Sequence, residues 1–196
     1  MRTITCGSLL LAAACILPGR HLWGQQDGAG SQSPSLEVSV MYTSLLTNVV
    51  RANMFWMQGG AIQVDGQFWH GLGVEADVSG LHAQNANNAG VGLDMVTAIF
   101  GPRYTWSPAH RRIAVFGHAL AGEVNGFNSV FPTAGATSSS ADSVAVQVGG
   151  GVDLRLKHRL SLRVFEADWL RTQLPNADTN VQNSLRLAAG AVVRFR

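Results

Sequence analysis

Apolar and polar residues alternate along much of this chain, and the alternation is clearest at the C-terminal end. Over residues 184–196 one alternating set is apolar, and the other set is small or cationic. The apolar set consists of Leu185, Leu187, Ala189, Ala191, Val193 and Phe195. Successive side chains of a strand point to opposite faces, so this pattern predicts a strand with one apolar and one polar face.

Seven similar segments precede this one, so the sequence predicts eight strands joined in hairpins. Their expected ranges are 36–42, 61–69, 72–81, 93–106, 113–123, 143–156, 160–171 and 184–196. Pro102 cannot donate a ladder hydrogen bond, and we expect a bulge there. A second bulge is expected near Val164–Phe165, where the alternation slips by one residue.

The connections between these strands alternate between long and short. The long ones, at 45–60, 82–92, 125–142 and 172–183, are almost uncharged, whereas the short turns carry basic residues. Aromatic residues are expected in two belts: Phe68, Trp69, Tyr104, Trp106 and Phe195 beside the short turns, and Tyr42, Phe127, Phe131 and Trp169 on the far side. An even strand number, this loop asymmetry and two aromatic belts are typical of a transmembrane β-barrel.

The polar faces of the predicted strands carry acids and arginines in near balance. They are Glu37, Asp65, Glu75, Asp77, Asp153, Glu166 and Asp168, with Arg103, Arg155, Arg163, Arg186 and Arg194. Eight strands make a barrel just wide enough for side chains to fill, and buried charges must be paired and hydrogen-bonded. We therefore expect an all-β fold: an eight-stranded antiparallel up-and-down transmembrane barrel whose polar lumen is closed by an ion-pair network. A soluble lipocalin-like carrier would show the reverse, with apolar residues inside and charges outside.

The N-terminal segment has the parts of a secretion signal. Arg2 precedes a short apolar core, and Pro18–Gly19 break that core. The predicted organisation is a cleaved signal at 1–24, a flexible leader at 25–35 and a barrel domain at 36–196. Cleavage before Cys15, as in a lipoprotein, is the alternative.

Composition bears on whether the chain is a soluble or a membrane-spanning protein. Charged residues are 13% of the chain, about half of the roughly 25% usual in soluble proteins. After the signal there is no run of about 18 apolar residues, so a chain that spans the membrane would have to do so with strands.

The sequence contains no recognisable catalytic or cofactor motif. Both cysteines, Cys6 and Cys15, lie in the expected signal, and the six histidines lack metal-ligand spacing. His118 is expected to pack in the lumen, and no basic–aromatic pattern points to nucleic acid. We therefore expect no cofactor, no metal and no enzymatic activity. A lipid-modifying enzyme would need a histidine with a nearby hydroxyl or carboxylate at the outer rim, where Glu123, Asp142 and Ser138 to Ser143 are the available groups.

Several stretches resemble the small outer-membrane β-barrel proteins of the OmpA-type superfamily. They are Phe-Gly-Pro-Arg-Tyr at 100–104, Phe-Gly-His-Ala-Leu at 116–120, Gly-Gly-Gly-Val-Asp-Leu-Arg at 149–155, Leu-Arg-Val-Phe-Glu-Ala-Asp-Trp at 162–169, and 185–195. The resemblance covers roughly residues 36–196 and concerns the fold. It implies the outer membrane of a Gram-negative-type bacterium, with outer-membrane lipid and the barrel-insertion machinery as partners. That machinery reads a closing Phe, which here is followed by Arg196.

The expected function is a structural or surface-contact role in which the long external loops meet a ligand that the sequence does not identify. The alternatives are a small pore, a lipid-modifying rim enzyme and the soluble lipocalin-like carrier.

Overall fold

The computed structural model describes residues 35–49, 54–84, 86, 91–108, 112–133, 136–176 and 179–195. The expected signal and nearly all of the expected leader lie outside these residues. No helix in the described ranges is long and apolar enough to cross a membrane.

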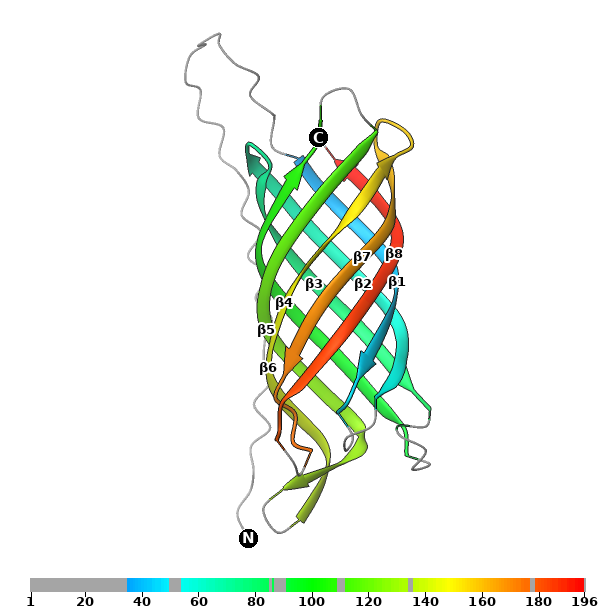
Figure 1. The fold of residues 1–196 in the computed structure, drawn as a ribbon, viewed down its shortest axis with the longest axis vertical. Coiled ribbons are helices and arrows are strands. Elements are labelled where there is room, and N and C mark those ends of the chain that lie inside the picture. The colour runs from blue at the N-terminus through cyan, green and yellow to red at the C-terminus, as the bar shows by residue number, and fades with distance from the viewer. Residues whose placement is uncertain are drawn as a thin grey trace. The chain divides into compact units, whose positions relative to one another are not determined.

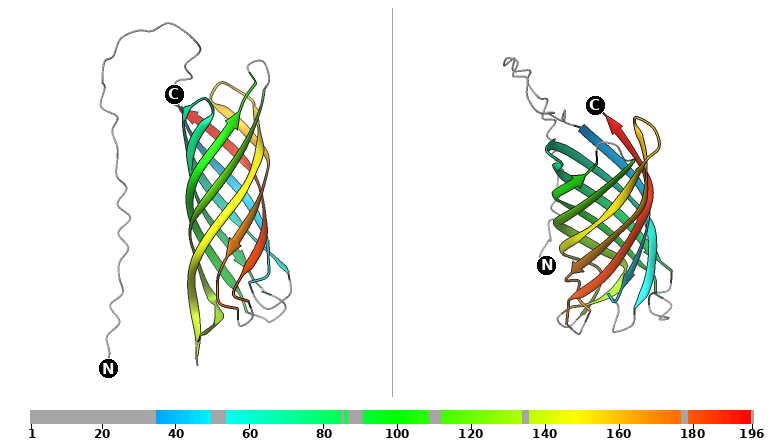
Figure 2. Two further views of the ribbon diagram at one scale, coloured as in Figure 1. Left: turned by 60° about the vertical axis from the view of Figure 1, so that its left-hand side comes forward. Right: turned by 45° about the horizontal axis from the view of Figure 1, so that its top comes forward.

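Eight strands close into one barrel, each hydrogen-bonded to its neighbours in sequence, and β8 pairs with β1 (Figures 1 and 2). All pairings are antiparallel, so the predicted up-and-down barrel is confirmed. The strands are β1 (Ser35–Thr47), β2 (Phe55–Trp69), β3 (Leu72–Ala83), β4 (Leu93–Trp106), β5 (Ile113–Thr133), β6 (Ala136–Arg155), β7 (Leu160–Thr172) and β8 (Gln182–Phe195).

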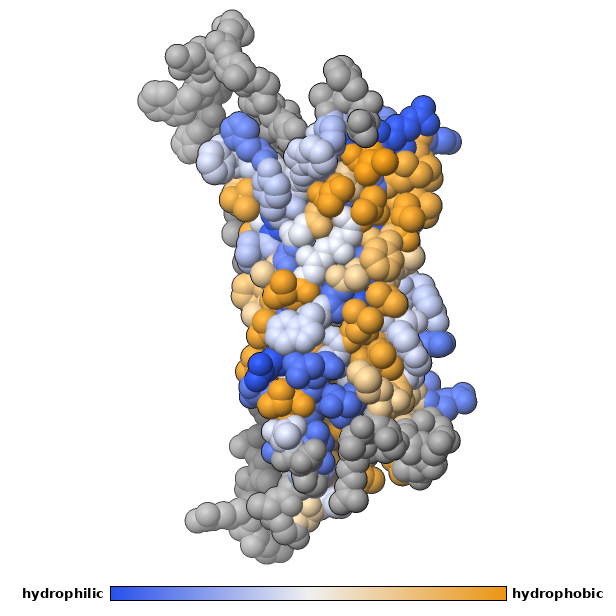
Figure 3. Space-filling model, viewed as in Figure 1, coloured by the Kyte–Doolittle hydropathy of each residue, from blue (hydrophilic) through white to orange (hydrophobic). Residues whose placement is uncertain are grey.

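The two faces of the barrel wall differ as the alternation predicts. Large apolar side chains of every strand are exposed on the outside, whereas the charged residues between them point inward and are buried. Figure 3 shows apolar residues spread over the wall, with hydrophilic residues gathered mostly toward its two ends. A soluble carrier would bury Leu185 and expose Arg186, but the structure exposes Leu185 and buries Arg186. The lipocalin-like arrangement is therefore not the one observed.

Four strands extend well beyond their predicted ranges at the end opposite the short turns. Phe55–Gly60 belong to β2, and most of the predicted loop 125–142 is the paired hairpin of β5 and β6. In β2 and β5 the prediction failed because inward-facing residues such as Met57 and Val124 are apolar, which hides the alternation. In β6 it failed because the missed residues are mostly small or polar and are exposed on both faces. Phe131, expected in the outer aromatic belt, is also buried inside this end of the barrel.

The two predicted bulges have different outcomes. The slip at Val164–Phe165 is a bulge, because the register shifts between Arg163 and Glu166 and both intervening side chains point outward. The prediction of a bulge at Pro102 is wrong, since the β4–β5 register is the same before and after this residue. Gly101 allows the close approach instead: a Cβ there would lie 2.1 Å from the Ala119 carbonyl oxygen.

The β5–β6 hairpin is bent by an irregularity that the sequence did not indicate. The register shifts between Phe127 and Phe131, and Asn128 has a φ of 56°. Asparagine tolerates this left-handed conformation better than most residues. Phe131 beyond the bend packs against the barrel's buried apolar side chains.

Candidate functional site: the layered barrel interior and the external rim

Arg163 of β7 is the most highly connected charge inside the barrel. Its guanidinium Nε donates to Asp153 Oδ1 at 2.8 Å, and Nη1 donates to Glu166 Oε2 at 2.7 Å. Nη1 also donates to the Gln63 side-chain carbonyl. Arg163 is fully buried, so these partners replace the water that the charge would have outside.

Arg186 of β8 forms a second centre in the same layer. It donates to Asp77 Oδ2 at 2.7 Å and to Gln147 Oε1 at 2.9 Å. Gln63 and Gln147 in turn donate to carboxylates, at 2.9 Å to Asp77 and 3.1 Å to Asp168. The two arginine centres are therefore joined through neutral amides.

Arg103 of β4 forms the third centre. Its Nη1 lies 2.6 Å from Glu75 Oε2 and 3.4 Å from Asp65 Oδ2. The Phe116 ring lies beneath both Arg103 and Arg163, with 3.8 Å and 4.2 Å from the guanidinium carbons to the ring centroid. Cations over an aromatic face are attracted by its quadrupole, and more strongly when they are desolvated.

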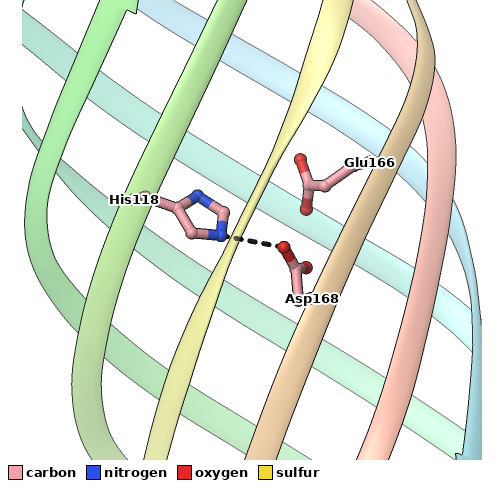
Figure 4. Close-up of side chains that lie close together, drawn as sticks. All are labelled: His118, Glu166 and Asp168. Carbon is pink, nitrogen blue, oxygen red and sulfur yellow. Dashed lines mark hydrogen bonds and ion pairs between the residues drawn. The ribbon is translucent and has the colours of Figure 1, made fainter.

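His118 lies between two carboxylates and is fully enclosed. Its Nδ1 lies 3.0 Å from Glu75 Oε1. Its Nε2 lies 3.0 Å from Asp168 Oδ1, the contact that Figure 4 shows as a dashed line. A neutral imidazole has one N–H and could donate to one of these oxygens, whereas an imidazolium could donate to both. The histidine thus links the Arg103 centre to the Arg186 centre.

His118, Glu166 and Asp168 are close enough together to hold a metal ion. However, Glu166 already accepts from Arg163 and Gln63, and Asp168 from Gln147. The cationic and amide partners account for these carboxylates, so the geometry favours an ion-pair network over a metal centre.

The glycine run at 149–151 makes room for this network. A Cβ on Gly149 would lie 2.0 Å from Asp168 Oδ1, and one on Gly151 would lie 2.8 Å from the Phe116 ring. The run serves close packing between β5, β6 and β7.

Most of the sequence-predicted site residues meet in this layer, and three lie apart from it. Arg194 and Glu37 pair with each other nearer the short-turn end. Arg155, at the end of β6, is only partly buried. Sequence reasoning missed Gln63 and Gln147 because they are neutral, although each occupies a polar-face position. It missed Thr43, whose hydroxyl accepts from Arg186 Nε at 3.2 Å, because Thr43 lies just beyond the predicted strand 36–42. The pairings themselves depend on strand register, which the sequence does not provide.

A second, apolar layer fills the barrel toward the long loops. Its core comprises Leu45, Val49, Met57, Leu81, Ala83, Ala86, Leu93, Met95, Ile99, Leu120, Val124, Phe131, Ala145, Leu170 and Leu174. These side chains come from all the strands except β8, and from three of the connections. The interior is therefore closed by charge pairs in one half and by apolar packing in the other.

At the long-loop end of the barrel, outside the apolar band, His82, Asp94 and Asn128 form an exposed cluster. His82 Nδ1 lies 2.5 Å from Asp94 Oδ1, and the Asn128 side-chain amide donates to Asp94 Oδ2 at 2.5 Å. The hydrogen bonds from Asn128 and His82 hold the pKa of the Asp94 carboxyl below its usual range. Within the described chain no hydroxyl hydrogen-bonds His82, so a nucleophile and base are not brought together. His118 is buried in the charged layer, as expected, and does not belong to this cluster.

Comparison with solved structures identifies the fold. The chain is similar to Neisserial surface protein A, with 14% identity, a TM-score of 0.59 and coverage of 85% of this chain and 100% of that chain. It is also similar to Ail, the attachment invasion locus protein of Yersinia pestis, with 14% identity, a TM-score of 0.56 and coverage of 84% and 100%. The outer membrane protein OprG of Pseudomonas aeruginosa matches with 8% identity, a TM-score of 0.55 and coverage of 85% and 98%.

No protein-family model matches the sequence, and no curated protein matches it significantly. The fold and its apolar outer wall nevertheless define the class: a small eight-stranded β-barrel of the outer-membrane type.

Replacing Arg163 with leucine tests the charged layer. The change leaves Asp153 and Glu166 buried without their cation, so we expect a loss of about 3–5 kcal/mol in the free energy of unfolding. Urea unfolding of the protein in lipid vesicles, followed by tryptophan fluorescence, measures the effect.

Arg171→Leu is the matched control, because Arg171 lies on the same strand but is exposed. We expect its effect to stay within about 0.5 kcal/mol. Equal small effects at both positions would mean that the stability of the barrel does not depend on the pairing of Arg163 with the buried carboxylates.

Proposed function

We propose that this protein is a closed barrel of the bacterial outer membrane that acts at the cell surface through its external loops and its β5–β6 hairpin. The observation that carries the proposal is that two packed layers, one charged and one apolar, close the interior. The charged layer and the apolar layer together leave the external end of the barrel as the part available for contact. An exported chain with a cleaved N-terminal signal and assembly by the barrel-insertion machinery are parts of the same proposal.

The β5–β6 hairpin is the feature best suited to contact. β5 and β6 continue past the last β4–β5 pair, Asp94 with Phe127, and past the last β6–β7 pair, Ala145 with Thr172. Their extension is rich in serine, and its side chains are mostly exposed. A paired hairpin that stands beyond its neighbours presents a polar surface without requiring the barrel to change shape.

The charge of the rim helps to define the kind of ligand. The structure of Ail was determined in complex with a heparin analogue, sucrose octasulfate. Here the outward charged residues of β4 to β6 near the rim are the acids Asp94, Glu123 and Asp142. This side of the barrel therefore disfavours a polysulfated ligand and suits an uncharged or cationic one.

Cysteine labelling tests whether the hairpin faces the cell exterior. Ser139→Cys lies on the β6 extension and His158→Cys in the short turn after β6, and both side chains are exposed. On intact cells we expect a membrane-impermeant maleimide to label position 139 and to label position 158 only after the outer membrane is opened. The reverse pattern would place the hairpin in the periplasm and contradict the proposed surface role.

Planar-bilayer recordings separate this proposal from the small pore. Because two packed layers cross the interior, we expect no stable conductance steps, with a porin in the same bilayer as the positive control. Regular steps whose size changes in Arg163→Leu would show that ions pass through the charged layer, and the pore would replace the closed barrel.

A further inference from the structure

A groove of about 520 Å³ lies on the outside of the wall, where β1, β2, β7 and β8 are neighbours. Tyr42 and Trp56 line it on one side, and Val164 and Phe165 line it on the other. Its floor includes Ala189 of β8. The groove is on the face that the fold turns toward hydrocarbon, so whatever fills it must be largely apolar.

The bulge in β7 explains why the groove exists. Between Arg163 and Glu166 the strand turns Val164 and Phe165 outward in succession. The two side chains form a ridge beside the small side chains of β8. Val164 and Phe165 both project outward from β7, whereas Ala189 on β8 is small, so a depression lies beside the ridge.

Two polar side chains stand in this otherwise apolar groove. Ser44 and Gln58 are directly paired across β1 and β2, and both line it. Neither makes a hydrogen bond to another residue in the described parts of the chain. An unsatisfied amide or hydroxyl facing hydrocarbon costs several kcal/mol, so both need a partner from outside the protein.

Their position defines where that partner lies. Outward residues further from the external end, Tyr42 and Val40 on β1, are aromatic or apolar. Trp56 lies on the external side of Gln58, and tryptophan favours the membrane interface. Ser44 and Gln58 are therefore at the level where an acyl chain of the external leaflet joins its polar linkage.

Charge near the external rim also differs around the barrel. Arg171, outward on β7, is exposed and has no ion pair with any residue that the structure describes. The outward acids Asp94, Glu123 and Asp142 lie instead on β4, β5 and β6. An anionic headgroup is thus favoured on the groove's side of the barrel.

We propose that this groove binds one acyl chain of a phosphorylated, N-acylated glycolipid of the lipid A class. Its amide or hydroxyl group meets Gln58 and Ser44, and its phosphate lies toward Arg171. The Gln58 carbonyl needs a donor, which the ester linkage of a phospholipid lacks and which an amide N–H or chain hydroxyl supplies. This inference rests on the outer-membrane location proposed above.

Trp56 is a built-in reporter of the groove. A variant that keeps Trp56 and has phenylalanine at Trp23, Trp69, Trp106 and Trp169 is placed in nanodiscs of brominated phosphatidylcholine, which quenches tryptophan next to its chains. A few mole per cent of unbrominated lipid A is then added. We expect Trp56 fluorescence to recover several-fold more than dilution of the brominated lipid explains. A variant that keeps only Trp169, which is outward on β7 but not in the groove, should recover in proportion to dilution.

Substitutions in the groove give matched controls. Gln58→Leu removes the polar partner of the lipid, and Ala189→Phe fills the floor of the groove. In both variants the recovery of Trp56 fluorescence should fall to the amount that dilution of the brominated lipid explains. Ala98→Phe, outward on β4, should leave the recovery unchanged.

Three results would overturn the assignment and leave the proposed function standing. Recovery at Trp56 no greater than at Trp169 would show that lipid A has no preference for the groove. Equal recovery with unbrominated phosphatidylethanolamine would show that any chain enters. Protection of Trp56 that depends on protein density and not on lipid A would mean that a second copy of the chain covers it. If brominated lipid quenches neither tryptophan, the barrel does not lie in hydrocarbon, and the proposed function fails with the inference.

Discussion

Arginine buried inside a wall that faces hydrocarbon determines how the rest of this structure is arranged. Water cannot reach Arg163 or Arg186 through the wall, so every guanidinium N–H must find its partner inside the barrel. Arg163 bonds to Asp153 on the adjacent β6 and to Glu166 on its own strand. Arg186 of β8 bonds to Asp77 of β3, and Arg103 of β4 bonds to Asp65 of β2. These last two pairs connect strands that are not adjacent, and they fix the barrel's register and its closed interior together.

The β7 bulge links the interior to the outer wall. By adding one residue between Arg163 and Glu166, it returns Glu166 and Asp168 to the inside, where Arg163 and His118 hold them. Because of this extra residue, Val164 and Phe165 lie next to each other on the outside of the barrel. One local irregularity thus completes the ion-pair network and forms the ridge of the lipid-facing groove. Gly149 on the neighbouring strand is needed for the same reason, because a side chain there would collide with Asp168.

The fold could be predicted from the sequence wherever one face of a strand is apolar and the other polar. β8 and β3 follow this pattern almost throughout, and their ranges were predicted to within two residues at each end. The prediction ended early in β1, β2 and β5 because their halves beyond the charged layer turn apolar side chains such as Leu45, Met57 and Val124 inward. In β6 it ended early because the missed residues are mostly small or polar and are exposed on both faces. Residues of the charged layer could be named from their polar-face positions. Their partners could not, since pairing depends on register and on neutral bridges such as Gln63.

The central claim is that the exposed valines and leucines of the wall lie in hydrocarbon. Val40 at mid-strand in β1 and Val130 on the β5 extension are exposed to 60% and 57%, so they differ mainly in their surroundings. The unfolding free energy of Val40→Arg and Val130→Arg in lipid vesicles tests the claim. We expect Val40→Arg to lose about 2–4 kcal/mol and Val130→Arg to change little, whereas equal and small effects would show that water covers the wall.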